Sequence, residues 1–343
     1  MQDDSASSGA DPGATIDMRD PGAVEAALRD GAAANRGARC RRGSIDVVDA
    51  TGAGSDERPA PERPRPDESR PEEGRPADTA LRLIATGDLH DNPLHFEILV
   101  RAAGMDGSAR RAGNGGVGAA PAHLTLHEII HGDRLLHGMD FSYRVLARVA
   151  ALKAAYPEHV HVLLGNHELA QMQRSGILKD GVRCVDAFSE GLAYAFGEDA
   201  SRVEAAIDDF VLSMPLALRV HTRRGDILCA HSVPPAAVMG KFDTTVLSRE
   251  LTIADYAPRQ GAAHLMVWGR GYDEEGLEDL VEAWGVYMFV LGHEKAPEGS
   301  KFVAPNAVVL NSDHEKGVYL PLDLTNPPTP AQAMGLVRRI MAP

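Results

Sequence analysis

The sequence lacks several features that mark whole classes of protein. It has only three cysteines, Cys40, Cys184 and Cys229, with no CxxC spacing and no even number to pair, which favours a reducing compartment over secretion. It has no run of about 18 consecutive apolar residues, so no membrane-spanning helix is expected. Its first residues lack both the basic and the apolar region of a signal peptide. These absences together predict a cytoplasmic protein.

Basic residues are also scarce relative to acidic ones. Lysine does not occur before Lys153, and the formal net charge is −14. A field of this sign repels nucleic acid and anionic membrane surfaces, so we expect neither as a partner. The hydrophobic content of 44% and the charged content of 24% are ordinary for a globular chain of 343 residues, which is long enough to bury a large core.

Residues 1–78 differ in composition from the rest of the chain. Pro, Gly, Ala, Asp and Arg dominate, and residues 58–66 alternate charge with proline, which removes backbone donors and forbids a helix. The few apolar side chains cannot offset the entropy of ordering this stretch. We therefore predict a disordered tail over residues 1–78 and a catalytic domain over residues 79–343. The pattern also permits a short helix at residues 23–29 and a strand at residues 45–48.

From Leu81 onward, strand patterns alternate with helix patterns. This order predicts parallel strands joined by helical crossovers. The predicted elements are a strand at 81–86, a helix at 93–103 capped by Asn92, a Gly-rich surface insertion at 104–122, a strand at 124–131, a helix after Asp140 and a strand at 160–164. Further along we predict helices at 185–196 and 201–212, a strand pair at 216–220 and 226–230, loops at 233–265, a helix after Asp273, strands at 286–291, 307–310 and 318–322, and a short helix at 331–341.

Polar residues follow many of these predicted strands at the point where each one ends. In open α/β sheets the carboxyl ends of strands are where ligands bind. Carboxylates, imidazoles and an amide oxygen suit divalent transition metals such as Mn, Fe or Zn, and one carboxylate can bridge two ions. The residues at these strand ends are Asp88 and His90, Asp133, Asn166 and His167, His231, and His293.

The motifs at these strand ends resemble a known family. In chain order they read GDLH at 87–90, HGD at 131–133, GNHE at 165–168, AHS at 230–232 and GH at 292–293. This series is similar to the calcineurin-like metallophosphoesterase superfamily, and within it to the serine/threonine phosphoprotein phosphatases, which MPL at 214–216 and WGRG at 268–271 also resemble. The resemblance implies a four-layer α/β/β/α sandwich.

The resemblance also implies an assignment of residues. Asp88, His90 and Asp133 would hold a first metal, and Asp133 would bridge to a second metal held by Asn166, His231 and His293. The two cations would lower the pKa of a bridging water, so that hydroxide attacks phosphorus. His167 would be the general acid that protonates the leaving oxygen. Arg270 would grip two phosphoryl oxygens at once.

The second motif departs from the family pattern, which usually reads GDxVDRG. Residues 132–138 read GDRLLHG. Leu136 stands where an aspartate would orient the catalytic histidine, and His137 stands where an arginine would hold phosphate. We expect Arg134 or His137 to supply the phosphate contact instead. Asp91 replaces a glycine of the first motif and adds negative charge near the site.

The sequence therefore predicts a metal-dependent phosphoesterase that hydrolyses phosphomonoesters with two divalent ions. Its predicted partners are phosphorylated substrates, with phosphoserine or phosphothreonine in a protein as the leading class. One alternative is a hydrolase of dinucleoside polyphosphates or of other small phosphate molecules. A second alternative is a metal-bearing binding protein without activity, suggested by the altered second motif.

Overall fold

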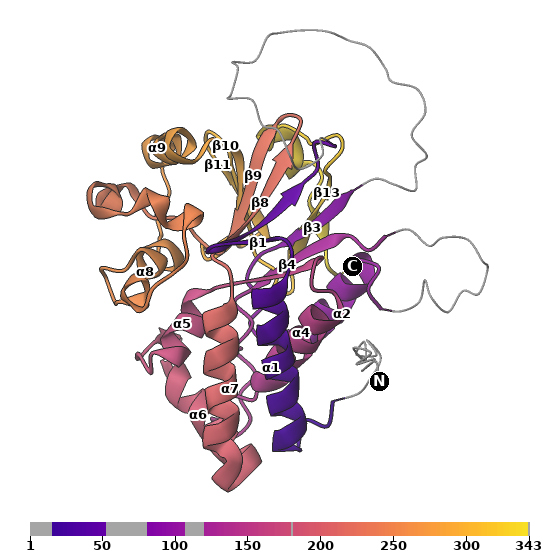
Figure 1. Cartoon of the computed structure of the whole chain (residues 1–343), viewed down its shortest axis with the longest axis vertical. Coiled ribbons are helices and arrows are strands. Elements are labelled where there is room, and N and C mark those ends of the chain that lie inside the picture. The colour runs from indigo at the N-terminus through magenta and orange to yellow at the C-terminus, as the bar shows by residue number, and fades with distance from the viewer. Residues whose placement is uncertain (1–15, 53–80, 107–119, 180, 342–343) are drawn as a thin grey trace, which may run out of the picture.

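Two sheets carry the architecture of the protein. The computed structural model describes residues 16–52, 81–106, 120–179 and 181–341. The first sheet has the strand order β14-β13-β3-β4-β5 and the second has the order β1-β2-β8-β9-β10-β12-β11. Figure 1 shows the sheets in the upper half of the molecule, with a group of helices below them.

The strands of the first sheet are β3 (Arg82–Thr86), β4 (His123–His127) and β5 (Val160–Leu163), which are parallel, followed by β13 (Val318–Asp323), antiparallel to β3, and β14 (Arg338–Arg339). Those of the second sheet are β1 (Arg41–Arg42), β2 (Ile45–Asp49), β8 (Ala217–Thr222), β9 (Gly225–Ala230), β10 (Val286–Leu291), β11 (Ser300–Val303) and β12 (Ala307–Leu310). In that sheet β9, β10 and β12 run parallel.

Alternating side chains place the two sheets face to face. In β9, Ile227 and Cys229 belong to a core cluster that also contains Leu83 and Ala85 of β3, so this cluster lies between the sheets. Their neighbour Leu228 belongs to the larger cluster that the helices cover. Because successive side chains of a strand point to opposite faces, each sheet is buried on both sides. The predicted sandwich of two sheets flanked by helices is confirmed.

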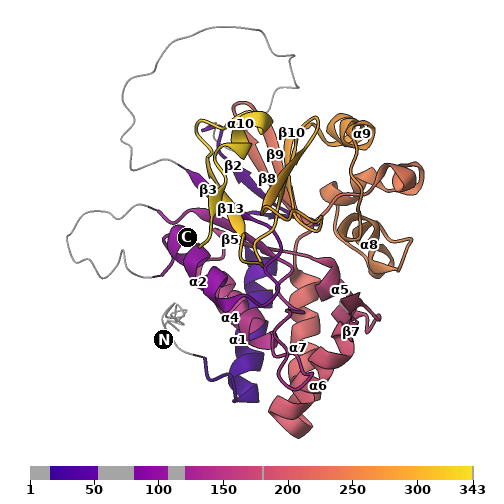
Figure 2. The same cartoon turned by 180° about the vertical axis from the view of Figure 1, so that it is seen from behind.

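Helices cover the outer faces of the sheets. Figures 1 and 2 show α1, α4, α6 and α7 as one group below the sheets and α8 and α9 beside the second sheet. The helices are α1 (Pro21–Gly37), α2 (Pro93–Ala102), α4 (Tyr143–Ala155), α5 (Asn166–Met172), α6 (Cys184–Phe196), α7 (Ala200–Ser213), α8 (Ala262–Val267), α9 (Glu274–Trp284) and α10 (Pro330–Met334). Short 3-10 turns fill residues 236–256, and a hairpin of β6 (Leu178–Lys179) and β7 (Val182–Arg183) precedes α6.

The predicted disorder of the N-terminal segment is wrong for residues 16–52. Val24, Leu28 and Ala32 lie on one face of α1 and are fully buried, where α1 packs against α4 and α7. Strand β2 pairs with β8 in parallel and extends the second sheet. The composition of residues 1–78 as a whole concealed this local pattern of apolar spacing. Residues 1–15 and 53–78 of the predicted tail lie outside the described residues.

The predicted end of the second strand is also wrong. The strand β4 ends at His127, because Glu128 has a left-handed φ of +49° and His131 one of +59°. Ile129 and Ile130 are buried in the loop that follows β4, which is why their apolar side chains resembled a longer strand. Elsewhere, residues 166–172 after β5 form α5, and the helix predicted at 331–341 ends at Met334 and is followed by β14. Of the insertion predicted at 104–122, residues 107–119 lie outside the described residues.

A buried polar chain ties the N-terminal segment to the first sheet. Asp46 of β2 accepts hydrogen bonds from Arg41 Nε at 2.9 Å and from His161 Nδ1 of β5 at 2.8 Å. His161 then accepts through Nε2 from His123 Nδ1 of β4 at 3.0 Å. Burial alone would raise the pKa of Asp46, but the hydrogen bond from His161 and the charge of Arg41 lower it. The carboxylate is therefore ionised and holds three strands together.

The described part of the chain contains no helix that is both long and apolar enough to cross a membrane. All three cysteines are free and buried.

The contact between α1 and α4 predicts the effect of one methyl group. A Cβ on Gly31 would lie 2.7 Å from Ala150 Cβ and 2.8 Å from Ala150 O, whereas a Cβ on Gly37 of the same helix would meet nothing within 4 Å. Alanine has the higher helix propensity, so Gly37→Ala should leave stability unchanged or raise it. Gly31→Ala should instead lower the free energy of unfolding by about 1–3 kcal/mol through overpacking. Urea unfolding measures both, and equal stability of the two variants would mean that α1 does not dock on α4.

Buried histidines predict a loss of stability in acid. Burial, with His161 and His159 nearby, lowers the pKa of His123 to about 2, while the unfolded residue titrates near ~6.5. Between these values the unfolded chain binds a proton that the folded chain excludes, so stability falls as the pH drops from 7. His123→Asn keeps a donor for His161 and should reduce the difference in unfolding free energy between pH 7 and pH 5 by about 2 kcal/mol. Urea unfolding at the two pH values tests this, and an unchanged difference contradicts it.

Candidate metal centre

The carboxyl ends of strands from both sheets meet at one buried group of polar side chains. Asp88 follows β3, Asn166 begins α5 directly after β5, His231 follows β9 and His293 follows β10. All four are at most 6% exposed. The two sheets thus bring together residues that lie more than 200 positions apart in the sequence.

His231 is at the centre of one half of this group. Its Nε2 lies 2.9 Å from Asn166 Oδ1 and 3.0 Å from His293 Nδ1. Its Nδ1 lies 3.4 Å from Asp88 Oδ1 and 3.2 Å from His127 Nδ1. Burial lowers the pKa of His231 to about 4, so the ring is neutral and carries one proton. Oxygen atoms that can accept a hydrogen bond face both ring nitrogens of His231. Because the ring has only one proton, the lone pair of the other nitrogen points at an acceptor atom.

Asp88 is fixed by the backbone of the opposite sheet. Both of its carboxylate oxygens accept from His293 N at 3.0 Å. Burial would raise its pKa, but hydrogen bonds from His127 and His231 hold the pKa well below its usual range. His127 Nε2 lies 2.9 Å from Thr86 O and its Nδ1 lies 3.4 Å from Asp88 Oδ1, so a neutral ring can donate to only one of these two oxygens.

Glu128 lies between two sets of histidines. Its Oε1 is 3.8 Å from His90 Nε2 and 3.6 Å from His167 Nε2, while its Oε2 is 3.6 Å from His231 Nε2. The residue is 2% exposed and accepts one backbone bond, from His167 N at 3.2 Å. Burial and the negative charges of Asp88 and Glu168 raise its pKa well above the ordinary value. The negative charge of the Glu128 carboxylate is therefore only weakly compensated by its neighbours.

The ring of His90 is oriented toward Glu128 by the loop after β4. Its Nδ1 donates to Ile130 O at 3.2 Å, so the lone pair on Nε2 faces the carboxylate. A ring held by a backbone acceptor in this way is typical of a metal ligand. Glu168 supports the same loop, because its Oε1 accepts from Ile129 N at 2.6 Å and from Ile130 N at 3.2 Å.

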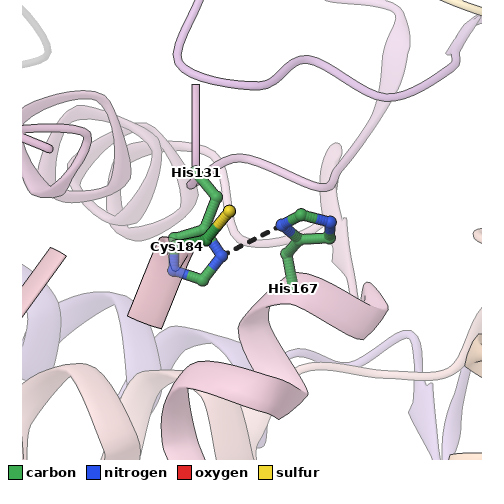
Figure 3. Close-up of side chains that lie close together, drawn as sticks. All are labelled: His131, His167 and Cys184. Atoms are coloured by element: carbon green, nitrogen blue, oxygen red, sulfur yellow. Dashed lines mark hydrogen bonds between the residues drawn. The ribbon is translucent and has the colours of Figure 1, made fainter. Parts of the chain in front are cut away.

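A second histidine orients His167. The Nδ1 atoms of His131 and His167 are 3.0 Å apart, and Figure 3 marks this contact with a dashed line. His131 Nε2 lies 3.0 Å from Gln171 Oε1, whose amide nitrogen donates to Ser189 Oγ. Because the amide oxygen can only accept, His131 carries its proton on Nε2 and accepts through Nδ1. His167 then donates through Nδ1, which leaves Nε2 directed at Glu128.

Asp133, predicted as the bridging carboxylate, does not lie in this group. Its side chain is 72% exposed and pairs with Lys179 Nζ at 2.9 Å. If the family's second motif is placed five residues earlier, its acid falls on Glu128 and its orienting aspartate on His131. This placement agrees with the contact between His131 and His167, whereas Leu136 is 54% exposed. The position of the strand end therefore corrects the motif alignment.

The three predicted phosphate contacts have different surroundings. Arg270 donates through Nη1 to His293 O at 2.5 Å, which places its exposed guanidinium at the edge of the group. Arg134 is exposed and donates to the backbone oxygen of Asp91. His137 is exposed in a tight turn with a φ of +53°. The structure brings Arg270 to the group and leaves His137 outside it.

The arrangement suits divalent cations. His293 Nε2 is buried without a hydrogen-bond partner, and the acceptors around His231 oppose one another. Described residues that could together hold an ion include Asp88 with His127 and His231, His90 with Glu128 and His167, and Glu128 with His231 and His293. Cations there would compensate the buried acids and the facing lone pairs.

A cavity of about 110 Å³ is lined in part by His131. It lies between the loop after β4, the hairpin β6–β7 and the first turn of α6. Asp133, Asp140, Lys179 and Cys184 are among its lining residues. Burial and the nearby Asp140 raise the pKa of Asp91 to about 7, so this carboxyl is about half ionised at neutral pH.

Sequence reasoning missed Glu128, His127, His131 and Gln171 as members of the site. The available signal was the apolar alternation of β4, which ends at Leu126, so that Glu128 is the first acid after the strand just as Asp88 is after β3. Gln171 carries no motif, and only the helical turn of α5 brings it beside His131.

One solved phosphatase structure shares this fold, and a second solved phosphatase is less similar. A protein serine/threonine phosphatase from Saccharomyces cerevisiae, similar to human phosphatase PP5, is 15% identical with a TM-score of 0.57, over 89% of this chain and 83% of that chain. A cold-active protein-tyrosine phosphatase of a psychrophilic Shewanella species is 17% identical with a TM-score of 0.48, over 74% of this chain and 84% of that chain. No curated protein sequence matches this chain significantly.

A model of the calcineurin-like phosphoesterase family matches residues 81–297, which is more than half of the sequence. The matched region includes every strand end that contributes to the group described above. Because the match and the buried acid–imidazole centre agree, the chain belongs to the calcineurin-like phosphoesterase family and is a phosphoric ester hydrolase.

Proposed function

We propose that the protein is a phosphomonoesterase that works with two divalent cations. One observation carries this proposal: the two oxygens of Glu128 face two separate sets of imidazoles. A carboxylate in that position can serve two ions at once, as in two-metal hydrolases. The predicted binding protein without activity is not supported, because the enzyme family matches the chain and the acid of the second motif is present as Glu128.

The proposed ligand sets follow the family pattern, with Glu128 in place of Asp133. Asp88, His90 and Glu128 would hold one cation, and Glu128, Asn166, His231 and His293 would hold the other. Mn, Fe and Zn all suit this mixture of oxygen and imidazole donors. Bound cations would supply a water of low pKa and would neutralise charge on the phosphoryl oxygens.

His167 is the proposed general acid. Its Nε2 faces the centre, 3.6 Å from Glu128 Oε1, and its Nδ1 is held by His131. With a second proton taken up on Nε2, the ring could pass that proton to the leaving oxygen of a bound ester. His131 takes the orienting role that an aspartate has in the family pattern, and Gln171 fixes which nitrogen of His131 carries the proton.

Arg270 is the proposed phosphate contact. Its guanidinium is anchored on His293 O and remains exposed, so its other N–H groups are available to a phosphoryl group. A planar guanidinium can donate to two oxygens of one phosphate, which compensates negative charge beside Asp91. Arg134 and His137 are less suited to this contact because both are exposed outside the buried group.

Phosphoserine or phosphothreonine in a protein is the leading substrate class. The motifs GNHE and WGRG and the fold shared with the yeast serine/threonine phosphatase support it. A small phosphate molecule such as a dinucleoside polyphosphate is the second candidate, favoured by the cavity that β6–β7 and α6 close over beside His131. The Mn²⁺-loaded protein should be assayed on phosphopeptides, an aryl phosphate and dinucleoside polyphosphates. If the protein hydrolyses none of these substrates, the proposed function is contradicted.

Removing the charge of Glu128 should disable the centre. Glu128→Gln keeps the size of the side chain but should lower turnover of an aryl phosphate by at least about a hundredfold and reduce the Mn²⁺ retained after dialysis, because both cations lose a ligand. Asp133→Asn is the matched control and should retain metal and activity. Elemental analysis and steady-state kinetics measure these effects. The opposite result would restore the bridging role to Asp133.

Removing the support of His167 should slow catalysis without removing the metal. His131→Ala should lower kcat about ten- to hundredfold, because the imidazole of His167 loses the partner that fixes its proton and its rotation. His131→Asp supplies an acceptor again and should recover part of the loss. Metal content should be the same in both variants. If His131→Ala turns over as fast as the unaltered protein, His167 is oriented by another group.

A further inference from the structure

A third group of possible metal ligands lies beside the proposed centre. His131 follows β4, His167 lies in the first turn of α5, and Cys184 is the first residue of α6. Figure 3 shows the Cys184 sulfur next to the two imidazole rings. One ligand atom from each residue lies within 4.8 Å of the others, and the residues are 1%, 7% and 5% exposed. None of the proposed ligands of the two-cation centre is a cysteine.

The distances and the ring protonation suit a small ion. Ligand atoms of a tetrahedral zinc ion are about 3.3–3.6 Å apart, given Zn–N near ~2.0–2.1 Å and Zn–S near ~2.3 Å. The Nδ1 atoms of His131 and His167 are 3.0 Å apart, so an ion between them requires a shift of a few tenths of an ångström. The Nδ1 lone pair of His131 already points toward His167 Nδ1. The Nε2–H of His131 donates to Gln171 Oε1, and zinc-bound histidines usually donate from their second ring nitrogen in the same way.

The site has an open side. His131 and Cys184 both line the cavity of about 110 Å³, which can hold a water as fourth ligand. Lys179 lines the same cavity and opposes a cation, but its Nζ lies 2.9 Å from Asp133 Oδ1, and Asp140 is a further lining residue. The two acids offset the charge of the lysine.

The other described cluster with a cysteine is less suitable. Cys40, Asp46 and His161 also have ligand atoms within 4.8 Å. There, however, Asp46 already accepts from Arg41 and His161. A cation would have to displace a guanidinium. This cluster is therefore a structural network.

We propose that His131, His167 and Cys184 form an inhibitory zinc site. Zinc is the ion that a thiolate and two imidazoles select. On binding, the thiol of Cys184 loses its proton to solvent, and the proton on His167 Nδ1 moves to Nε2, while His131 keeps its proton on Nε2. The His131–His167 hydrogen bond is replaced by two Zn–N bonds. Because Nδ1 is then bound to zinc and no longer hydrogen-bonded to His131, His167 loses the contact that orients it as the general acid.

Cobalt tests the site directly, because a thiolate bound to Co²⁺ gives a charge-transfer band in the near ultraviolet. Co²⁺ added to the Mn²⁺-loaded full chain should produce this band, saturating at one equivalent. Cys184→Ser should abolish the band. Cys229→Ser and Cys40→Ser are matched controls that exchange the other two cysteines and should retain it. Thermal unfolding checks that the Cys184→Ser variant is folded, and Zn²⁺ protection of Cys184 from iodoacetamide in the unaltered chain is a second measurement.

No band, or a band that survives in Cys184→Ser, overturns the zinc site. Loss of the band in Cys40→Ser would place the site at the Asp46 cluster and equally overturns it. The inhibitory effect rests on the proposed function and is measured separately. Each protein is compared with itself in the absence of zinc. Zn²⁺ in excess over Mn²⁺ should reduce aryl phosphate turnover by the unaltered chain at least about tenfold, and turnover by Cys184→Ser much less. A positive band without turnover would reject the proposed function while keeping the metal site.

Discussion

The burial of acidic side chains at the junction of two sheets is the constraint on which the rest of the structure depends. Asp88, Glu128 and Glu168 lie within one region that is almost closed to water. Charges in such a place are costly unless they are paired or coordinate metals. Asp88 is compensated by His127 and His231 and by backbone N–H groups, and Glu168 by the backbone of the loop after β4. Glu128 has one backbone donor and faces neutral imidazoles, so it is the acid that most needs cations.

The loop after β4 determines what the site can do. It contains Glu128, whose left-handed backbone ends the strand, and His131, whose ring holds His167. Glu168 and Gln171, both on α5, fix the two ends of this loop. The loop and the helix therefore support one another, and a change in either would move both Glu128 and His167. Cys184 of α6 lies beside the rings of His131 and His167.

The N-terminal segment belongs to the framework that holds this site. Strand β2 extends the second sheet, and its Asp46 accepts from His161 on β5, the strand that leads to Asn166. Helix α1 covers α4 and α7, with Gly31 in close contact with Ala150. Because the two sheets must keep their carboxyl ends together, a buried ion pair and hydrogen-bond chain between them helps to fix the spacing of the metal ligands. The catalytic framework thus begins well before Leu81.

The sequence by itself determined the layered α/β architecture and most of the site. Apolar strands ending in GDLH, GNHE, AHS and GH are local patterns, and the structure brings Asp88, His90, Asn166, His231 and His293 together as those patterns predict. The tertiary structure alone decided which acid follows β4, because Ile129 and Ile130 are apolar in a buried loop as they would be in a strand. It also decided the partner of His167 and the docking of α1. Those features depend on contacts between residues distant in sequence, and no local spacing encodes them.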